Sequence, residues 1–155
     1  MKRDDTDILT RSSLFRGIAV GKIEGMIRSA NPAEKQYRTD EVVAFAGAPY
    51  ERLLLILEGV LATEIVDYSG KTLKMERFRE SQSIAAGILF ATDNTLPVRI
   101  FAESDSRLLA FSRAAVLSMC RDNPVFLENF LQTGGDRVKL LAAKLRFHQF
   151  NTIKQ

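Results

Sequence analysis

The residues most often used in catalysis and metal binding are scarce in this chain. It has one histidine, His148, and one cysteine, Cys120. One cysteine cannot hold an iron–sulfur cluster, which takes four ligands, and one histidine cannot build the several-histidine metal site of a cupin enzyme. The sequence also contains neither a Ser/His/Asp pattern nor a phosphate-binding P-loop. It therefore predicts no catalytic residue, no metal site and no enzyme.

A few side chains can still serve as ligands of a haem iron. His148 can be an axial ligand, can form a pH-sensitive pair with its counterpart in a dimer, or is simply a polar helix residue. Cys120 can act in redox or haem chemistry only if its thiol is exposed and has a low pKa. Met26, Met75 and Met119 are most simply expected to fill gaps in the core. Haem therefore remains one candidate cofactor.

The composition is that of one compact domain. Of 155 residues, 46% are hydrophobic and 26% are charged, so the chain can bury a real core. Its net charge of +3 comes from interleaved acidic and basic residues, which form no dense nucleic-acid-binding stripe. No apolar run approaches the roughly 20 residues that span a bilayer, and the N-terminus lacks the hydrophobic region of a signal peptide. We therefore expect a cytoplasmic protein, a location that also suits a single cysteine.

The elements that must position these residues are of two kinds. The first ten residues are polar and are expected to be irregular, whereas Leu14 to Ala30 have the apolar spacing of a helix. From Lys35 to Phe111, apolar runs of about 5–8 residues alternate with turns, which is typical of an antiparallel sandwich or barrel. Glycines recur every four residues in the first helix and are expected to let it pack closely on the barrel: Gly17, Gly21 and Gly25.

Two helices follow the predicted strands. Ser112 can cap a short helix from Arg113 to Arg121, and Asn123–Pro124 offers an N-cap followed by proline at the first helical position. The helix that starts there is expected to reach about Phe150, far beyond the average of roughly 11 residues. The sequence therefore predicts a mainly β fold with flanking helices.

Two apolar stripes run along the long helix. One has the 4,3 spacing of a heptad seam and consists of Leu127, Leu131, Gly134, Val138, Leu141, Leu145 and His148. The other lies to one side and consists of Phe126, Phe130, Leu140 and Phe147. The barrel can cover one stripe and a second copy of the helix the other, so the pattern predicts a homodimer. The alternative is a helix broken at Gly134–Gly135 and packed within the chain, because each helical glycine costs about 1 kcal/mol.

The order and spelling of these segments resemble the cyclic AMP receptor protein and FNR family of bacterial transcription regulators, from about Leu14 to Gln155. The best local match is LLLILEGVLATEIVDYSGKTLKMERF, which contains Gly59 and the turn from Asp67 to Gly70. The stretch YRTDEVVAFAG before it and NPVFLENFL at the start of the long helix are also similar to the family.

This resemblance implies a fold and a division of the chain. The fold is a double-stranded β-helix, or jelly-roll, followed by a long C-terminal dimerisation helix. Residues 1–122 would form a cyclic-nucleotide-binding-like sensor domain, and residues 123–155 would form the dimerisation helix and the start of a hinge. DNA would be bound only through a helix-turn-helix domain beyond Gln155.

In cyclic-nucleotide-binding relatives, a Gly-Glu-hydrophobic-Gly cassette binds the ribose, and a later Arg-Ser/Thr pair binds the cyclic phosphate. The matching stretch here has Ala85 and Ala86 in place of Gly-Glu, and Leu96–Pro97 in place of the pair. Cyclic AMP is therefore not expected to bind in the usual way. Arg99 is the nearest cation, either a displaced phosphate partner or an ordinary solvated strand residue. The apolar cassette suits haem or a fatty or aromatic acid, or is closed by its own side chains.

The resemblance thus implies an effector-sensing and dimerisation domain of a transcription regulator. A small molecule would bind between the barrel and the long helix and shift the helix pair. The residues expected to line its site are Ser83, Ala86, Leu96, Arg99, Leu140, Leu141 and Lys144. The alternatives are a ligand-free dimerisation scaffold and a haem or redox-gas sensor of the same family.

Overall fold

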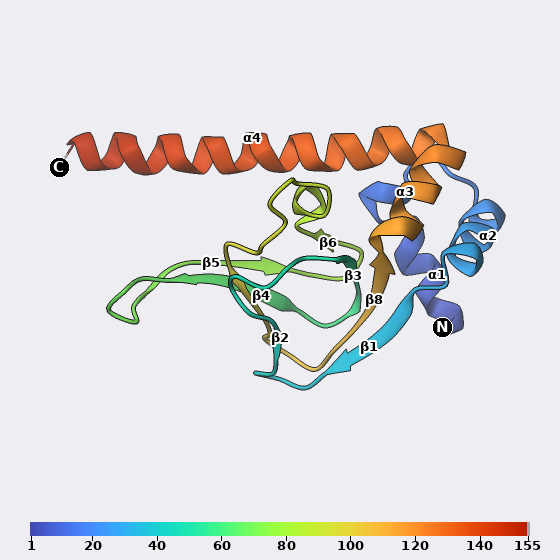
Figure 1. The fold of residues 1–155 in the computed structure, drawn as a ribbon, viewed down its shortest axis with the longest axis horizontal. Helices are drawn as coiled ribbons and strands as arrows, with labels where there is room; N and C mark the ends of the chain where they lie inside the picture. The colour runs from blue at the N-terminus through green and yellow to red at the C-terminus, as the bar shows by residue number, and fades with distance from the viewer. Residues whose placement is uncertain (155) are drawn as a thin grey trace.

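Two four-stranded antiparallel sheets form the body of the protein, and a long helix lies along one side of it (Figure 1). The structure, a computed structural model, describes residues 1–154, and their side chains outside positions 3, 73–74 and 147–154. The strand order is β1-β8-β3-β6 in the first sheet and β2-β7-β4-β5 in the second, which confirms the predicted jelly-roll with flanking helices. The strands are β1 Ala33–Tyr37, β2 Val42–Ala44, β3 Arg52–Glu58, β4 Leu61–Val66, β5 Thr72–Phe78, β6 Ser83–Ile84, β7 Arg99–Ala102 and β8 Ser106–Ser112.

Strand β3 lies at the centre of the core. Its five apolar residues 53–57 are all buried. Strands β8 and β6 flank it within the sheet, and helices α1 (Arg3–Thr10) and α3 (Arg113–Asp122) both contact it. A strand covered on both faces has no solvent side to make polar, so its sequence is one unbroken apolar run.

The turns on either side of β4 lie where the sequence predicts them. Gly59 joins β3 to β4 with φ +91°, and a Cβ atom there would lie 2.3 Å from Ser106 Oγ, so no larger residue fits. The β4–β5 hairpin turns at Asp67, whose carboxylate accepts hydrogen bonds from the backbone N–H groups of Ser69 and Lys71, each at 2.9 Å.

Helix α1 contradicts the expectation that the first ten residues are irregular. Its first turn is fastened by Asp5, which accepts a hydrogen bond from the backbone N–H of Lys2 at 2.8 Å and pairs with Arg107 of β8 at 2.7 Å. Arg107 also pairs with Glu34 at 2.8 Å and with Glu58 at 3.4 Å. We call Asp5, Glu34, Glu58 and Arg107 the N-terminal cluster. The first turn of this helix is polar, and it is held in place because Asp5 pairs with Arg107, which lies 102 positions further along the chain.

Hydrogen bonding sets the charge state of the N-terminal cluster. Burial raises the pKa of Asp5, but the hydrogen bonds from Arg107 and from the Lys2 backbone outweigh it and leave that pKa below its usual range. The pKa of Glu34 is also lowered, chiefly by its hydrogen bond from Arg107. The same bonds raise the pKa of Arg107. Asp5, Glu34 and Arg107 are therefore ionised at neutral pH.

The predicted helix from Leu14 to Ala30 is in fact two elements, a short 3-10 helix η1 (Ser13–Phe15) and the helix α2 (Val20–Ala30). The break falls at Gly17, whose φ of +78° cannot continue a right-handed helix. A Cβ atom at Gly21 or Gly25 would meet no atom within 4 Å, so the expected close packing of these glycines on the barrel is wrong.

The two C-terminal helices begin as predicted. Ser112 Oγ caps α3 by accepting a hydrogen bond from the Ala115 N–H at 3.1 Å. Helix α4 (Pro124–Lys154) starts at the proline, while the side chain of Asn123 donates to the Met119 carbonyl and closes α3. The helix passes unbroken through Gly134–Gly135, so the alternative of a break there is wrong.

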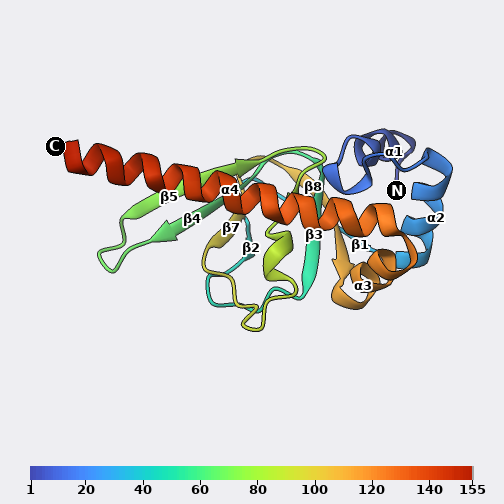
Figure 2. The same cartoon turned by 90° about the horizontal axis from the view of Figure 1, so that it is seen from above.

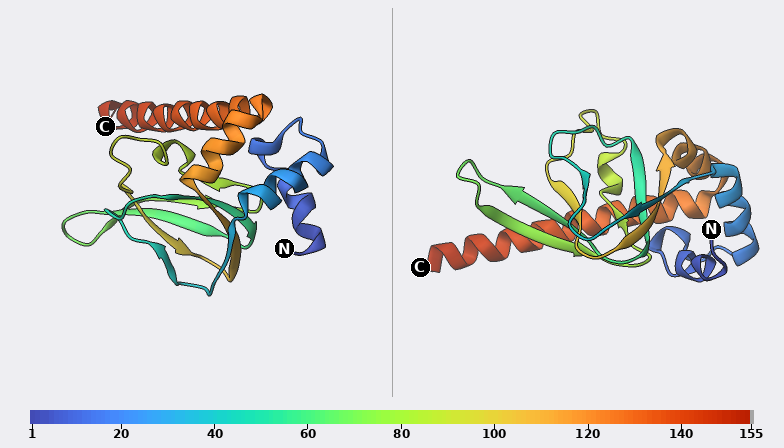
Figure 3. Two further views of the ribbon diagram at one scale, coloured as in Figure 1. Left: turned by 45° about the vertical axis from the view of Figure 1, so that its right-hand side comes forward. Right: turned by 90° about the horizontal axis from the view of Figure 1, so that it is seen from below.

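Helix α4 is the longest element of the fold. Seen from above and from below, it crosses the whole body and then continues past it (Figures 2 and 3). Among residues 1–154, the structure contains no helix with the length and apolar character needed to cross a membrane.

Candidate functional site between the roll and helix α4

The cassette follows strand β6 as a short 3-10 helix, η2 (Ala86–Ile88). Tyr50 holds β6 in place, because its hydroxyl donates to the Ile84 carbonyl and accepts a hydrogen bond from the Leu54 N–H at 3.1 Å. Burial raises the pKa of Tyr50, so the hydroxyl remains a neutral donor. Ser83 is half-buried within β6, where it pairs with Leu55 in the sheet.

The side chains of the cassette close it from within. Ala86 and Leu96, the residues at the family's ribose and phosphate positions, are both buried in the main hydrophobic core. Leu89 is buried beside them, and Ile88 and Phe90 are partly buried against the same core. Phe90 reaches α4, where its ring meets that of Phe130 edge-on at a centroid distance of 5.7 Å. The cassette is therefore a packed apolar wall on the roll side of α4.

Ala85 at the start of the cassette has an unusual backbone conformation for an alanine. Its φ is +53°, in the left-handed region that costs an alanine roughly 1–2 kcal/mol. Glycine adopts this conformation freely, and a glycine occupies this position in the Gly-Glu cassette described above. The conformation of Ala85 is therefore one that the glycine of that cassette would adopt without strain.

Arg99 lies away from this wall. In strand β7 the alternate residues Ile100 and Ala102 are fully buried in the core, so Arg99 is on the opposite face. There it forms an ion pair with the buried carboxylate of Glu64, its cross-strand neighbour in β4, and its guanidinium lies over the Phe101 ring. Arg99 is thus neither a displaced phosphate ligand in the cassette nor a fully solvated residue.

One face of α4 is bound to the rest of the chain. Phe126 and Phe130 are buried, and the Phe126 ring packs against Phe15 of η1 at 5.4 Å. Asn129 donates to the carbonyls of Leu14 and Arg16, at 3.0 and 2.8 Å. The first half of the helix is therefore fixed in position. The second apolar stripe is not covered at Leu140, which is 47% exposed, and the side chain of Phe147, its last member, lies outside the described residues.

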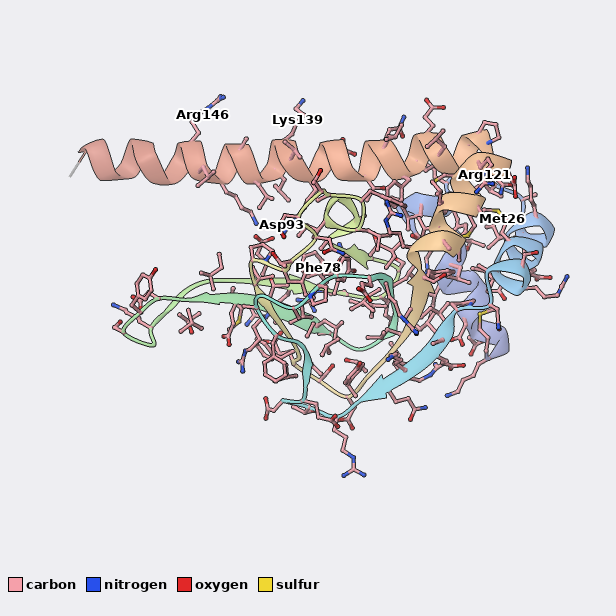
Figure 4. All side chains as sticks on the ribbon, in the orientation of Figure 1. Met26, Phe78, Asp93, Arg121, Lys139 and Arg146 are labelled. Carbon is pink, nitrogen blue, oxygen red and sulfur yellow. The ribbon has the colours of Figure 1, made fainter. Side chains whose placement is uncertain are left out.

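Charged side chains connect the next part of α4 to strand β5. Glu76 of β5 pairs with Arg137, and its carboxylate lies 3.7 Å from Lys144 Nζ. The Arg137 guanidinium also stacks over the Phe78 ring at 5.1 Å, and Figure 4 shows Phe78 between the sheet and α4. We call Glu76, Arg137 and Lys144 the helix cluster. Of the expected lining residues, Lys144 belongs to it and Leu141 lies half-buried near it on α4.

Sequence reasoning missed Glu76 and Arg137. The Met75 side chain was expected in the core but is 41% exposed, while Glu76 next to it turns toward α4 with a side chain only 12% exposed. At Met75 and Glu76 the order of exposed and buried side chains is thus the reverse of the expected one, whereas Phe78 is buried. Nothing in the sequence around Glu76 indicates its partner, which lies 61 residues further along the chain.

The predicted seam forms a stripe along α4 that the chain itself does not cover. Leu131, Val138 and Leu145 are 64–66% exposed, and Leu127 is 40% exposed. Gly134 and Leu141, between them, are half-buried. The side chain of His148, the last predicted seam residue, lies outside the described residues.

The sulfur side chains near α3 are not arranged for redox chemistry. Cys120 is buried, and that burial raises the pKa of its thiol, which disfavours the reactive thiolate. Met26 and Met119 are buried in the core, as expected. Two surface hollows of about 570 and 510 Å3 lie elsewhere, between α2 and α3 and beside Arg107, and no cassette residue lines either of them.

Comparison with known proteins places this geometry in a family. The model of the cyclic nucleotide-binding domain family matches residues 34–123, which are more than half of the chain. None of the curated proteins compared with the chain matches it.

Several solved structures share the fold. A transcriptional regulator from Thermotoga maritima is 27% identical, with a TM-score of 0.73 over 81% of this chain and 95% of that chain. The sensor domain of the regulator DNR from Pseudomonas aeruginosa is 18% identical, with a TM-score of 0.74 over 91% and 93%. The catabolite activator protein of Thermus thermophilus is 17% identical, with a TM-score of 0.79 over 90% of this chain and 64% of that one.

These three proteins are named as transcription regulators or as an activator protein, and their matches cover 81–91% of the present chain. The chain belongs to the cyclic nucleotide-binding domain family and has the fold of the sensor domains of Crp/Fnr-family transcription regulators.

Proposed function

We propose that this chain is the effector-sensing and dimerisation domain of a bacterial transcription regulator. It acts as a cytoplasmic homodimer, does not respond to cyclic AMP in the usual way, and acts on DNA through a separate helix-turn-helix domain. The observation that carries the proposal is the difference between two faces of α4. One face is fastened to the roll through Phe126, Asn129 and Phe130, and the seam is apolar and exposed.

The seam supports a second copy of this chain as its partner. Apolar side chains at heptad spacing are the pattern of a two-helix coiled coil, and each fully buried Leu or Val contributes about 1.5–3 kcal/mol. A Cβ atom at Gly134 would meet nothing within 4 Å, so a second helix has room for close approach at that point.

The cassette supports the loss of ordinary cyclic nucleotide binding. Its ribose and phosphate positions hold buried alanine and leucine, and the nearest arginine, Arg99, is committed to Glu64 on the other face of the sheet. A cyclic phosphate placed there would lose charge-assisted hydrogen bonds worth about 1.5–3 kcal/mol each.

A ligand-free dimerisation scaffold is the second candidate. The specific observation in its favour is that Ala86, Leu89 and Leu96 fill the cassette as part of the continuous core. In that case the roll would only position α4, and no small molecule would change the helix pair.

The oligomeric state tests the leading proposal. Sedimentation equilibrium should show a dimer for the native chain and a monomer for Leu131→Asp, which places a charge on the seam. Leu140→Asp is the matched control, because it adds the same residue to an exposed position of the same helix off the seam, and it should stay dimeric. A monomeric native chain would contradict the proposal. Calorimetric titration with cyclic AMP should show no binding, and micromolar binding would contradict the account of the cassette.

A further inference from the structure

We propose that the effector is an anion and that Arg137 and Lys144 of α4 recognise it, in place of the arginine missing from the cassette. This inference rests on the sensor function proposed above and names the ligand class of the same site. Glu76 is then the internal counterion that occupies these two cations when no effector is bound.

The two cations lie where an effector would meet the helix. They are seven residues apart, which is about two turns of α-helix, so they project from the same face of α4. Both contact Glu76. Its cross-strand partner Thr63 is buried, and the Phe78 ring, also of β5, lies under the Arg137 guanidinium. The η2 helix of the cassette contacts α4 as well. An anion at this place would therefore touch both the roll and the helix.

The cluster keeps donors that Glu76 does not use. Arg137 has five N–H groups, and Lys144 has three, whose 3.7 Å separation from the carboxylate exceeds hydrogen-bond length. Their side chains are 33% and 39% exposed, against 12% for Glu76, so they are the accessible part of the cluster. Two cations and one carboxylate leave these three groups with one positive charge, which a monoanion would neutralise.

This arrangement gives the ligand a direct effect on α4. An anion that competes with Glu76 for Arg137 weakens the described ionic link between β5 and the helix, and so favours a different position of α4. An uncharged effector would not compete with Glu76 for Arg137, so it would not favour a different position of α4 through this cluster.

Inorganic phosphate is a suitable probe for calorimetric titration at pH 7, with chloride keeping the ionic strength constant. Removing the internal counterion by Glu76→Gln should tighten phosphate binding by at least about tenfold, the factor that one charge-assisted hydrogen bond supplies. The double variant Glu76→Gln/Arg137→Met should lose that gain. The control is Lys139→Met, because Lys139 points away from the roll in Figure 4, and it should bind phosphate like the native chain.

Equal phosphate affinity in the native chain and Glu76→Gln would overturn the inference, as would tight binding that survives in the double variant. If Glu76→Gln does not fold, Lys144→Met decides: it must weaken phosphate binding severalfold while Lys139→Met does not. The dimer measurement separates the two proposals. A dimer that binds phosphate no better without Glu76 contradicts only the anion site, whereas a native monomer contradicts the proposed function itself.

Discussion

The N-terminal cluster and the helix cluster use the same chemistry for different ends. In the first, one arginine meets three carboxylates from other elements, and in the second, two cations of α4 meet one carboxylate of β5. The Arg107 side chain is 11% exposed and its partner Asp5 only 2%, whereas Arg137 is 33% exposed. Arg107 also contacts three carboxylates, while two cations share Glu76.

The comparison shows that burial determines how much free energy it costs to break an ion pair. Arg107 and Asp5 are costly to separate, because both side chains are buried and each would lose its partner without gaining water. A half-exposed arginine can exchange its carboxylate for another anion at little cost. The first arrangement suits a contact that stays closed, and the second suits a contact that can open.

The largest effect should come from Arg107→Met, which keeps the apolar stem but leaves Asp5 buried without its cation. Breaking a buried pair in this way costs about 3–5 kcal/mol. Urea unfolding monitored by circular dichroism should show that loss in the free energy of unfolding. A loss below about 1 kcal/mol would show that α1 contributes little to the fold.

Acid should remove part of the same stability. Asp5 and Glu34 have pKa values below their usual range, so their contribution is complete above the unfolded pKa of about 4 and is lost as the pH falls through the lower folded values. Urea midpoints measured from about pH 7 to pH 2.5 should therefore decrease as the pH falls below about 4. This decrease should be smaller in Arg107→Met and unchanged in Arg137→Met. An equal decrease in both variants would remove the distinction between the clusters.

Arg137→Met should destabilise the chain by only about 1 kcal/mol. The pair with Glu76 is partly exposed, and the contact with the Phe78 ring adds a similar small amount. The same urea experiment measures it. A loss near that of Arg107→Met would mean that the helix cluster is also a contact that stays closed.

The smallest effect is expected at the outer surface. Arg77 and Glu103 form an ion pair at 2.7 Å, with the Arg77 side chain 50% exposed. Arg77→Met should leave the urea midpoint unchanged within error, because solvent screens such pairs. This variant is the reference for the changes in urea midpoint of Arg107→Met and Arg137→Met. A clear decrease in its own midpoint would mean that those changes do not report burial.

Local patterns were enough to predict most of the fold. The run at β3, the Asp67–Gly70 turn and the Asn123–Pro124 helix start each depend on neighbours within a few residues, and each lies where expected. The uncovered seam of α4 was also predicted, because a heptad spacing needs no tertiary information. Helix α1 was missed, since its first turn is held by the long-range ion pair of Asp5 with Arg107, which local spacing does not reveal.

The charged part of the site could not be predicted in the same way. Arg99 and Glu64 are paired by the register of β7 on β4, and Glu76 meets Arg137 because α4 returns over β5. The spacing of these residues in the sequence does not indicate which cation pairs with which carboxylate. The absence of polar groups from the cassette, by contrast, was visible directly from Ala86 and Leu96.

The unbroken course of α4 through Gly134–Gly135 has a mechanical consequence. The helix contacts the roll from Phe126 to Lys144, and about ten residues, or roughly 15 Å, lie beyond that attachment. A rigid helix works as a lever, so a tilt of about 5° at its attached part would carry the far end by about 1.3 Å. A hinge at the glycines would absorb such a tilt, whereas a continuous helix amplifies it and delivers it at a distance.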